Sequence, residues 1–345
     1  MAKQRKFVFV LGAGASLAAG AVARVQAGGR IPIPTQATFW PTLLRYCSRD
    51  DRRTIEGFLF RYFLGYDRVP ARLDRAGREK LLAAVDVEEV FTFISERSRA
   101  PSTAPQARAQ VEAVWEVMVA AVSDCFRRFP PNAATRALYD RLRTNQIRAR
   151  DAVVSFNYDT VFESSLIKSV RWAYAGLEPP SRAMPVIKPH GSVNWALGSD
   201  DRIGRHKRAV QKPVIVAPTH LKFVSYAQQG SSSEGTTMRN LAGYLDQSDD
   251  VRRIWEAMEY QMRSARALVF IGYSFPPADL YFASVLRSVL ASRGSNPDVV
   301  VVNPDAIAIA ERLRQRFALE KIVKYFDLHQ YARATRREVI RQLES

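Results

Sequence analysis

Polar side chains suited to acid–base chemistry follow two short apolar runs of this chain. Asn157 and Asp159 come just after residues 152–155, and His190 follows residues 185–188. An unperturbed imidazole titrates near neutrality, so His190 can take a proton from a hydroxyl group or from water. The Asn157 amide can hold such a hydroxyl or water in place. We therefore interpret Asn157 and His190 as candidate catalytic residues.

A glycine-rich turn follows the first apolar run, residues 7–11. It has the sequence Gly-Ala-Gly-Ala-Ser, and a helix is expected over residues 16–25. A strand that ends in glycines and leads into a helix presents backbone N–H groups to an anion, which favours a phosphate or pyrophosphate ligand. The alternative is a turn that only packs the strand against the helix.

A dehydrogenase would fit this turn only in part. Its fingerprint needs a third glycine at position 17 and an acidic residue about 20 residues further on, which holds the ribose. Position 17 is leucine, and the first acidic residue of the chain is Asp50. Hydride transfer is therefore disfavoured.

The elements that must position these residues are predicted as buried strands alternating with helices. Further apolar runs stand at 214–216, 268–271 and 299–302, and helices are expected near 250–264, 280–292 and 306–317. This alternation favours an α/β fold with a Rossmann-like, doubly wound parallel sheet. Such open sheets bind ligands at the carboxyl ends of their strands, where the polar residues fall.

Residues 36–148 predict a helical subdomain inserted after the glycine-rich turn. Helices are expected over roughly 38–46, 50–64, 78–97, 106–129 and 135–145. The interval is too long for a plain crossover between strands. Residues 1–345 would then form a single domain with this insertion over one side of the cleft. The polar, low-complexity stretch within 225–249 predicts a flexible loop, either a lid or a plain disordered loop.

Taken together, the motifs resemble the sirtuin family, and within it the bacterial sirtuin-like proteins that hydrolyse NAD. The resemblance is carried by GAGAS at 12–16, IPIPT at 31–35, FNYD at 156–159, KPHGSVNW at 188–195, FIGYSFPPAD at 270–279 and NPD at 303–305. Several motifs in family order are more specific than any one of them.

This resemblance implies that NAD is bound as a substrate and assigns roles to individual residues. Asn157 and His190 would be catalytic. The residues implied to bind the dinucleotide are Gly12, Ala13, Gly14, Ser16, Asp159, Gly191, Gly272, Ser274 and Asn303. The pyrophosphate would lie on the glycine-rich turn, and the adenosine ribose would lie near Asn303.

The chain departs from the family's deacylases in two respects. The deacylases carry glutamine where Phe156 stands, and they have a four-cysteine zinc module. This chain contains two cysteines, Cys47 and Cys125, so it cannot build such a module; no zinc and no other metal site are expected. Cys125 shares the spacing of the apolar residues of its helix and is expected in the core.

A formal net charge of +17, carried mostly by arginine, is the main compositional signal. It is compatible with non-specific contact to nucleic acid through phosphates, although no sequence-reading motif accompanies it. A solvated basic surface, an arginine-rich codon bias or attraction for an acidic dinucleotide explains it equally well. The few cysteines and the lack of a membrane-length apolar run indicate a cytoplasmic protein without membrane association. The first apolar run continues into the glycine-rich turn, so it is expected to be a strand and not a signal peptide.

The expected activity is that of an NAD glycohydrolase, which releases nicotinamide and leaves ADP-ribose or a cyclised form. The resemblance further implies an effector of bacterial antiphage defence that depletes NAD. It would act as a homo-oligomer, with a partner ATPase or a nucleic-acid-guided protein. Two alternatives stay open: an NAD-dependent protein deacylase or ADP-ribosyltransferase, and a non-catalytic assembly module that binds NAD or ADP-ribose. The sequence leaves the activating trigger open.

Overall fold

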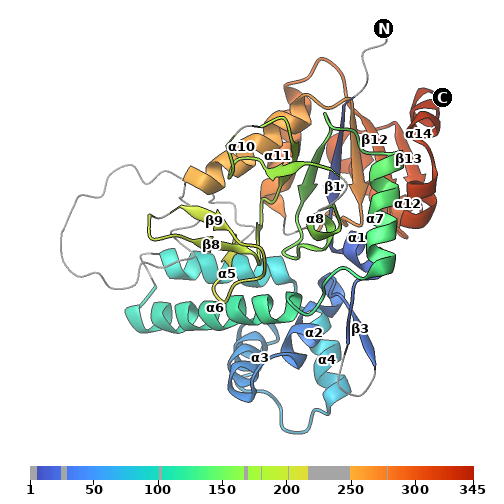
Figure 1. Ribbon diagram of the computed structural model, residues 1–345. Coiled ribbons are helices and arrows are strands. Elements are labelled where there is room, and N and C mark those ends of the chain that lie inside the picture. Colours follow the sequence, from blue (N-terminus) through green and yellow to red (C-terminus); the bar gives the residue numbers. More distant parts are fainter. Residues whose placement is uncertain are drawn as a thin grey trace.

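A sheet of seven parallel strands forms the centre of the molecule (Figure 1). The structure is a computed structural model, and it describes residues 6–24, 29–100, 103–166, 170–179, 181–200, 202–216, 249–277 and 279–345. The strand order is β13-β12-β11-β1-β4-β6-β5. The bounds are β1 (Phe7–Leu11), β4 (Ala152–Ser155), β5 (Trp172–Tyr174), β6 (Met184–Ile187), β11 (Ala267–Ile271), β12 (Asp298–Val302) and β13 (Ile322–Tyr325). The predicted α/β fold with a Rossmann-like, doubly wound parallel sheet is confirmed.

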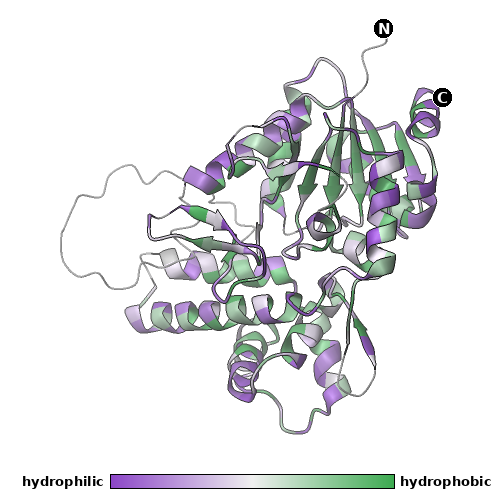
Figure 2. Ribbon diagram, in the orientation of Figure 1, coloured by the Kyte–Doolittle hydropathy of each residue, from purple (hydrophilic) through white to green (hydrophobic). Residues whose placement is uncertain are grey.

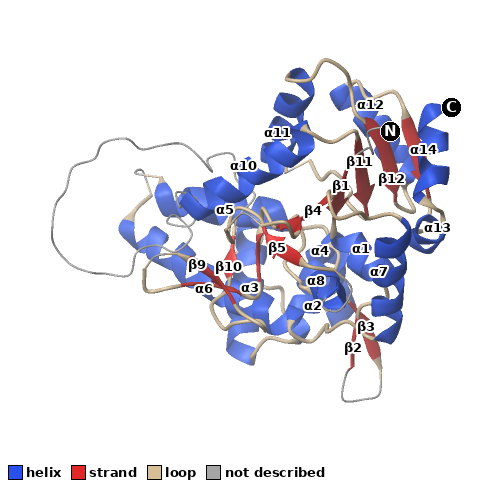
Figure 3. Cartoon of the chain, turned by 45° about the horizontal axis from the view of Figure 1, so that its top comes forward, coloured by secondary structure: helices blue, strands red, loops and turns tan. Residues whose placement is uncertain are grey.

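The central strands are buried along their whole length because helices cover both faces of the sheet. Every residue of β1, β4, β11 and β12 is buried, which is typical of strands in parallel sheets. Figure 2 shows these strands in the hydrophobic colour and the outer faces of the helices in the hydrophilic one. In Figure 3, α11 (Leu280–Ala291) and α12 (Ala306–Phe317) lie on one side of the strands, and α1 (Ala13–Ala18) and α7 (Ala133–Asn145) lie on the other.

The order of the strands reverses beside β1. From β1 the chain crosses to β4 on one side, while β11, β12 and β13 are added on the other side. Ligands of open α/β sheets bind at such a switch point, in the crevice outside the carboxyl ends of the strands. The glycine-rich turn, Asn157 and Gly272 follow the three strands that meet there.

Further helices pack around the central sheet. Helix α7 packs against α8 (Val161–Leu166) and α13 (Leu328–Arg333). Helix α10 (Asp249–Arg263) packs against α11, and α14 (Arg336–Glu344) packs against the edge strand β13.

Two short antiparallel pairs lie outside the central sheet: β7 (Gly191–Ser192) with β10 (Val214–Ile215), and β8 (Trp195–Leu197) with β9 (Ile203–Arg205).

Helices between α1 and α7 form a layer of their own, which we call the helical layer. It follows the hairpin of β2 (Val22–Arg24) and β3 (Arg30–Pro32) and the 3₁₀ turn η1 (Gln36–Thr38). Its members are α2 (Phe39–Arg45), α3 (Arg49–Phe63), α4 (Arg75–Ala83), α5 (Val87–Arg99) and α6 (Pro105–Phe126). Helices α2, α3 and α5 all pack on α6, where Cys125 is fully buried as predicted. The division of the chain into one domain with an insertion at 36–148 stays a prediction.

Two predicted helices were wrong in extent. The helix expected over 16–25 is the short α1, because Gly20 turns the chain with φ of +74° and residues 22–24 pair with β3. The helix expected over 78–97 is two helices. Asp86 interrupts it and caps α5, since its carboxylate accepts hydrogen bonds from the N–H groups of Glu88 and Glu89.

The predicted set of sheet strands was also incomplete. The run at 214–216 does not join the central sheet, because β10 pairs antiparallel with β7. The edge strands β5 and β13 were not predicted, so the run at 299–302 is not the last strand of the sheet. The flexible loop expected within 225–249 lies outside the described residues, apart from Asp249, which begins α10. Among the described residues, no helix is long and apolar enough to cross a membrane.

Candidate active site

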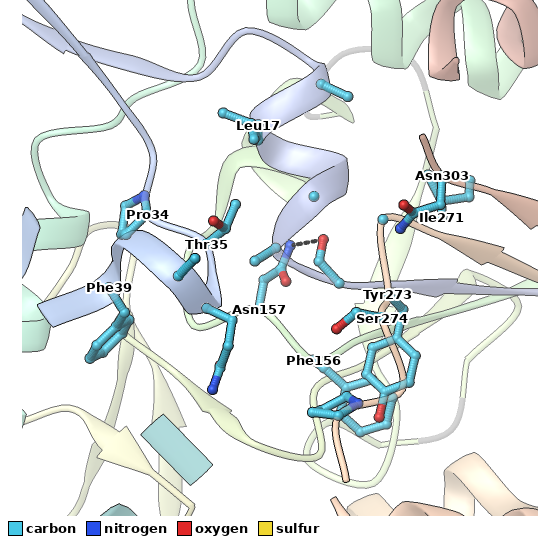
Figure 4. A pocket seen from close by; sticks show the side chains of 18 of the residues that line it. Leu17, Pro34, Thr35, Phe39, Phe156, Asn157, Ile271, Tyr273, Ser274 and Asn303 are labelled. Atoms are coloured by element: carbon cyan, nitrogen blue, oxygen red, sulfur yellow. Dashed lines mark hydrogen bonds between the residues drawn. The ribbon is translucent and has the colours of Figure 1, made fainter. Parts of the chain in front are cut away.

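A cavity of about 520 Å³ opens at the carboxyl ends of the central strands (Figure 4). Its volume is typical of small-molecule sites. The turns after β1, β4, β11 and β12 form one wall, and η1, α2 and α5 contribute from the helical layer. Most of the predicted site residues line this cavity: Gly12, Ala13, Gly14, Asn157, Asp159, His190, Gly272, Ser274 and Asn303.

Asn157 is held by two acceptors behind the cavity surface. Its Nδ2 donates to the carbonyl oxygen of Gly12 at 3.0 Å and to Ser16 Oγ at 3.2 Å. Ser16 Oγ in turn donates to the Asp159 carboxylate, at 3.1 Å from Oδ2. Because both contacts occupy Nδ2, the amide oxygen Oδ1 is the Asn157 atom available to a ligand. Figure 4 shows the Asn157 side chain between Thr35 and Ser274.

Ser16 was predicted to bind the dinucleotide, and the structure places it elsewhere. Its side chain is 1% exposed and does not line the cavity, because it lies behind Asn157 and Asp159. Its hydroxyl connects those two side chains. Ser16 is therefore a positioning residue.

A fully buried lysine anchors the turn that carries Asp159. Lys188 Nζ donates to the backbone carbonyl of Asp159 at 2.6 Å and pairs with the Glu163 carboxylate at 3.0 Å. The Asp159 side chain accepts the N–H of Val161 at 2.8 Å. Burial raises the pKa of Asp159 to about 6, against the opposing effect of the Lys188 charge. Lys188 was noted in the KPHG motif but not predicted as part of the site.

His190 follows β6 and lines the cavity with an aromatic neighbour at its side. The residue is 3% exposed, and the centre of its ring lies 4.8 Å from that of Phe156 in an edge-to-face arrangement. The Phe156 ring is stacked on Tyr273 at 5.0 Å. The structure thus brings both predicted catalytic residues, Asn157 and His190, to one cavity. Their catalytic role stays a prediction.

The glycine-rich turn packs against a second turn more closely than any side chain would allow. The N–H of Gly12 donates to the carbonyl of Ile271, and the N–H of Gly14 donates to that of Gly272, both at 3.0 Å. A Cβ on Gly14 would stand 2.9 Å from the Gly272 backbone. The expectation that these two N–H groups face an anion is therefore wrong, and close packing explains both glycines. They still line the cavity, together with Ala13.

Gly191 is the other predicted binding residue that the structure moves away from the cavity. It does not line the cavity, and it lies in β7, paired with Ile215 of β10. Its φ is +81°, and a Cβ would stand 2.1 Å from the carbonyl oxygen of Val214. Glycine is needed there for the turn and for the close approach of β10.

Several residues line the cavity although the sequence analysis did not assign them to the site. Glu88 reaches the cavity from the first turn of α5, and Phe126 reaches it from the end of α6. Asp327 follows β13, a strand that was not predicted. Thr35 belongs to the IPIPT motif, so the motif was the only sequence signal for this part of the wall.

A family model for the SIR2-like domain matches residues 151–325. The match runs from the start of β4 to the end of β13 and covers more than half of the 345-residue chain. The chain belongs to the SIR2-like family. The matched residues include Asn157, His190 and Gly272. No curated protein matches the chain in sequence.

Membership of the SIR2-like family implies that the chain binds NAD. The glycine-rich turn precedes the matched residues, but β1 lies between β4 and β11, so this turn completes the same cavity. The cavity offers a polar floor at Asn157 and an aromatic wall at Phe156 and Tyr273, which suits a ribose next to a flat base. Across the described residues, no group of three or more His, Cys, Asp or Glu is placed to hold a metal ion.

Proposed function

We propose that this SIR2-like protein is an NAD glycohydrolase. It cleaves the bond between nicotinamide and ribose and forms nicotinamide and ADP-ribose or a cyclised product. The observation that carries the proposal is the cavity in which Asn157 and His190 both lie beside the glycine-rich turn. The NAD site implied by the family supports the choice of substrate.

The reaction asks for few protein groups. Nicotinamide leaves as a neutral molecule, so its departure needs no general acid, and positive charge develops on the ribose. The protein must hold the sugar, exclude bulk water and supply a nucleophile. Asn157 meets the first requirement, because its Nδ2 is held by Gly12 and Ser16 and its Oδ1 can accept a hydrogen bond from a ribose hydroxyl or from the attacking water.

His190 is the candidate general base that prepares the nucleophile. A neutral imidazole can take the proton of the attacking water, or of a ribose hydroxyl during cyclisation. The aromatic ring of Phe156 at its side limits the water that can reach it. The family's deacylases carry glutamine at this position, and the apolar ring here favours hydrolysis of NAD over protein deacylation.

The proposal extends to a role in bacterial antiphage defence through depletion of NAD. The resemblance of the motifs to NAD-hydrolysing sirtuin-like effectors supports it. Such an effector would be a homo-oligomer whose activity is raised above a measurable basal rate by a partner ATPase or a nucleic-acid-guided protein. The net charge of +17 supports contact with an acidic partner or with nucleic acid.

Chromatographic analysis of the products tests the activity. Purified protein is incubated with NAD, alone and with an acetylated peptide. We expect nicotinamide and ADP-ribose or its cyclic form without the peptide, and we expect Asn157→Ala and His190→Ala each to lower the rate by about 100-fold or more. His206→Ala and Asn296→Ala are matched controls, because both residues are exposed and lie outside the cavity. Cleavage that requires the peptide would indicate a deacylase, and binding of NAD without cleavage would indicate an assembly module.

A further inference from the structure

A second cavity, of about 770 Å³, lies within the helical layer. It is formed by β3, α2, α3 and α4, which Figure 1 shows grouped together away from the central sheet. No residue of the candidate active site lines it. Its polar lining is rich in arginine: Arg30, Arg45, Arg52, Arg75 and Arg78.

Two of these arginines are fixed by the backbone. Arg52 Nε donates to the carbonyl of Leu44 at 2.9 Å, and Arg78 Nε donates to the carbonyl of Leu73 at 3.0 Å. Arg52 is exposed, and Arg78 is half-buried. Within the described residues, neither guanidinium forms an ion pair, so their terminal nitrogens remain available as donors. A guanidinium held in place in this way loses little freedom when it binds an anion.

The acidic residues of this cavity do not neutralise it. Glu79 is engaged by Arg45 at 3.2 Å and by Arg75 at 3.0 Å. Asp74 caps α4 by accepting the N–H of Gly77 at 2.8 Å. Glu56 is the carboxylate that faces Arg52 and Arg78; burial raises its pKa, and the charges of Arg78 and Arg52 oppose that rise. The five arginines thus outnumber the three carboxylates that line the cavity.

Helix α2 connects this cavity to the candidate active site. Phe39, its first residue, lines the cavity of the candidate active site. Pro41, Leu44 and Arg45, further along the same helix, line the second cavity. The preceding segment has the same arrangement, since residues 30–31 line the second cavity and residues 34–37 line the first. A ligand that moves α2 in one cavity therefore changes the wall of the other.

We propose that the second cavity binds a small phosphate-bearing anion and that its occupancy changes the affinity of the active site through α2. The guanidinium groups of Arg52 and Arg78 hold the phosphate by charge-assisted hydrogen bonds. Pro41, Leu44 and Leu82 provide an apolar surface for the rest of the ligand. The excess of positive charge matches a dianion.

Isothermal titration calorimetry with inorganic pyrophosphate at constant ionic strength tests the site. We expect saturable binding that Arg52→Gln with Arg78→Gln weakens by about tenfold or more, since two charge-assisted contacts are lost. Arg53→Gln is the matched control; Arg53 is a neighbour on α3 that is 65% exposed and does not line the cavity. Pyrophosphate affinity that is equal in the double variant and in the control would overturn the proposal.

A second variant guards against misfolding of the double variant. Glu56→Gln removes the one carboxylate that faces both arginines, so it should strengthen pyrophosphate binding severalfold while Arg52 keeps its bond to Leu44. Unchanged or weaker binding in Glu56→Gln would contradict the charge argument.

The link to the active site is measured with ADP-ribose, which is not cleaved. This part rests on the proposed function, so ADP-ribose binding alone is measured first; its absence would count against the proposed function and leave the pyrophosphate result intact. We expect saturating pyrophosphate to change the ADP-ribose affinity at least severalfold in the wild-type protein and in Arg53→Gln, and not in the double variant. An unchanged affinity in the wild type would refute the coupling. So would a change that persists in the double variant, because that change would reflect competition in the active site.

Discussion

Asn157 and Asp159 stand two positions apart in the chain, and their environments give them different tasks. Asn157 presents its amide oxygen to the cavity because its nitrogen is bound behind it. Asp159 also lines the cavity, but its carboxylate is occupied by Ser16 and by the N–H of Val161. We therefore interpret Asp159 as the group that orients Ser16 and, through it, Asn157. The protonation state of Asp159 then bears on both stability and activity.

The raised pKa of Asp159 predicts how stability depends on pH. The folded protein holds a proton on this carboxyl up to about pH 6, whereas the ordinary value is 3.8. The folded state therefore binds more protons than the unfolded state between these values, so the free energy of unfolding falls as the pH rises from about 4 to about 6. The difference in pKa corresponds to about 3 kcal/mol, which is lost by pH 7.

Denaturation by urea at a series of pH values, for the wild type and for Asp159→Asn, measures this effect. The asparagine can still accept the N–H of Val161 and can donate to Ser16, so the fold should be kept. Its stability should depend less on pH between 4 and 6. Identical pH profiles for the two proteins would show that Asp159 does not titrate in this range.

At the scale of elements, the site depends on two turns that touch backbone to backbone. The turn after β1 and the turn after β11 are joined by hydrogen bonds from Gly12 and Gly14. Gly272 has φ of +60°, and a Cβ on it would stand 2.1 Å from the backbone nitrogen of Ala15. The strands fix where the turns begin, and the glycines allow the turns to meet.

Replacing Gly272 with alanine should damage the site more than the backbone angle alone explains. Gly20 is the matched control, because its φ is +74° and a Cβ there would meet no atom within 4 Å. Gly20→Ala should lower the free energy of unfolding by about 1–2 kcal/mol, which is the usual effect of a left-handed backbone conformation at a residue with a side chain. Gly272→Ala should cost clearly more and should abolish ADP-ribose binding, because the two turns must separate.

Thermal denaturation and calorimetric titration with ADP-ribose compare these variants. The comparison is informative because both variants carry the same kind of backbone strain. Equal losses of stability, with ADP-ribose binding intact in Gly272→Ala, would show that the contact between the turns is dispensable.

At the scale of the whole molecule, aromatic side chains join the helical layer to the site. The Phe91 ring of α5 packs against two other rings: its centre lies 5.3 Å from that of Trp115 of α6 and 6.3 Å from that of Tyr158. Tyr158 lines the cavity next to Asn157. The centre of its ring lies 6.3 Å from that of Phe126 of α6. The helical layer is thus packed directly on the residues of the site, which gives a displacement within this layer a route to the cavity.

Truncation of Phe91 should therefore affect both stability and ligand binding. Phe91 is fully buried, so Phe91→Ala should cost about 3–5 kcal/mol. It should also weaken ADP-ribose binding, because Tyr158 loses its support. Phe93→Ala is the control on the same helix; Phe93 is half-buried and packs on Phe58 and Phe63 within the helical layer.

Urea denaturation and ADP-ribose titration distinguish the two roles. Phe93→Ala should lose stability while the ADP-ribose affinity stays close to that of the wild type. A loss of affinity of the same size in both variants would mean that the affinity follows the general stability of the helical layer and not the contact with Tyr158.

Much of the fold could be predicted because local patterns carried it. The buried strands β1, β4, β11 and β12 are continuous apolar runs, and helices α10, α11 and α12 have clear apolar periodicity. The edge strands β5 and β13 were missed because they are short and only partly buried, so their residues lack a continuous apolar pattern. The strand β10 was assigned to the wrong sheet because an apolar run does not specify its partner.

The sequence by itself determined which strand ends carry polar residues, and therefore that Asn157, His190 and the glycine-rich turn meet at one edge of the sheet. Only the tertiary structure decided how these groups are used. Ser16 and Lys188 act from behind the cavity, and the N–H groups of Gly12 and Gly14 are taken by the neighbouring turn. The physical reason is that hydrogen-bond partners and burial depend on residues that are distant in the chain, by 29 positions for Lys188 and Asp159 and by more than a hundred for the partners of Ser16, Gly12 and Gly14. No local pattern records such partners.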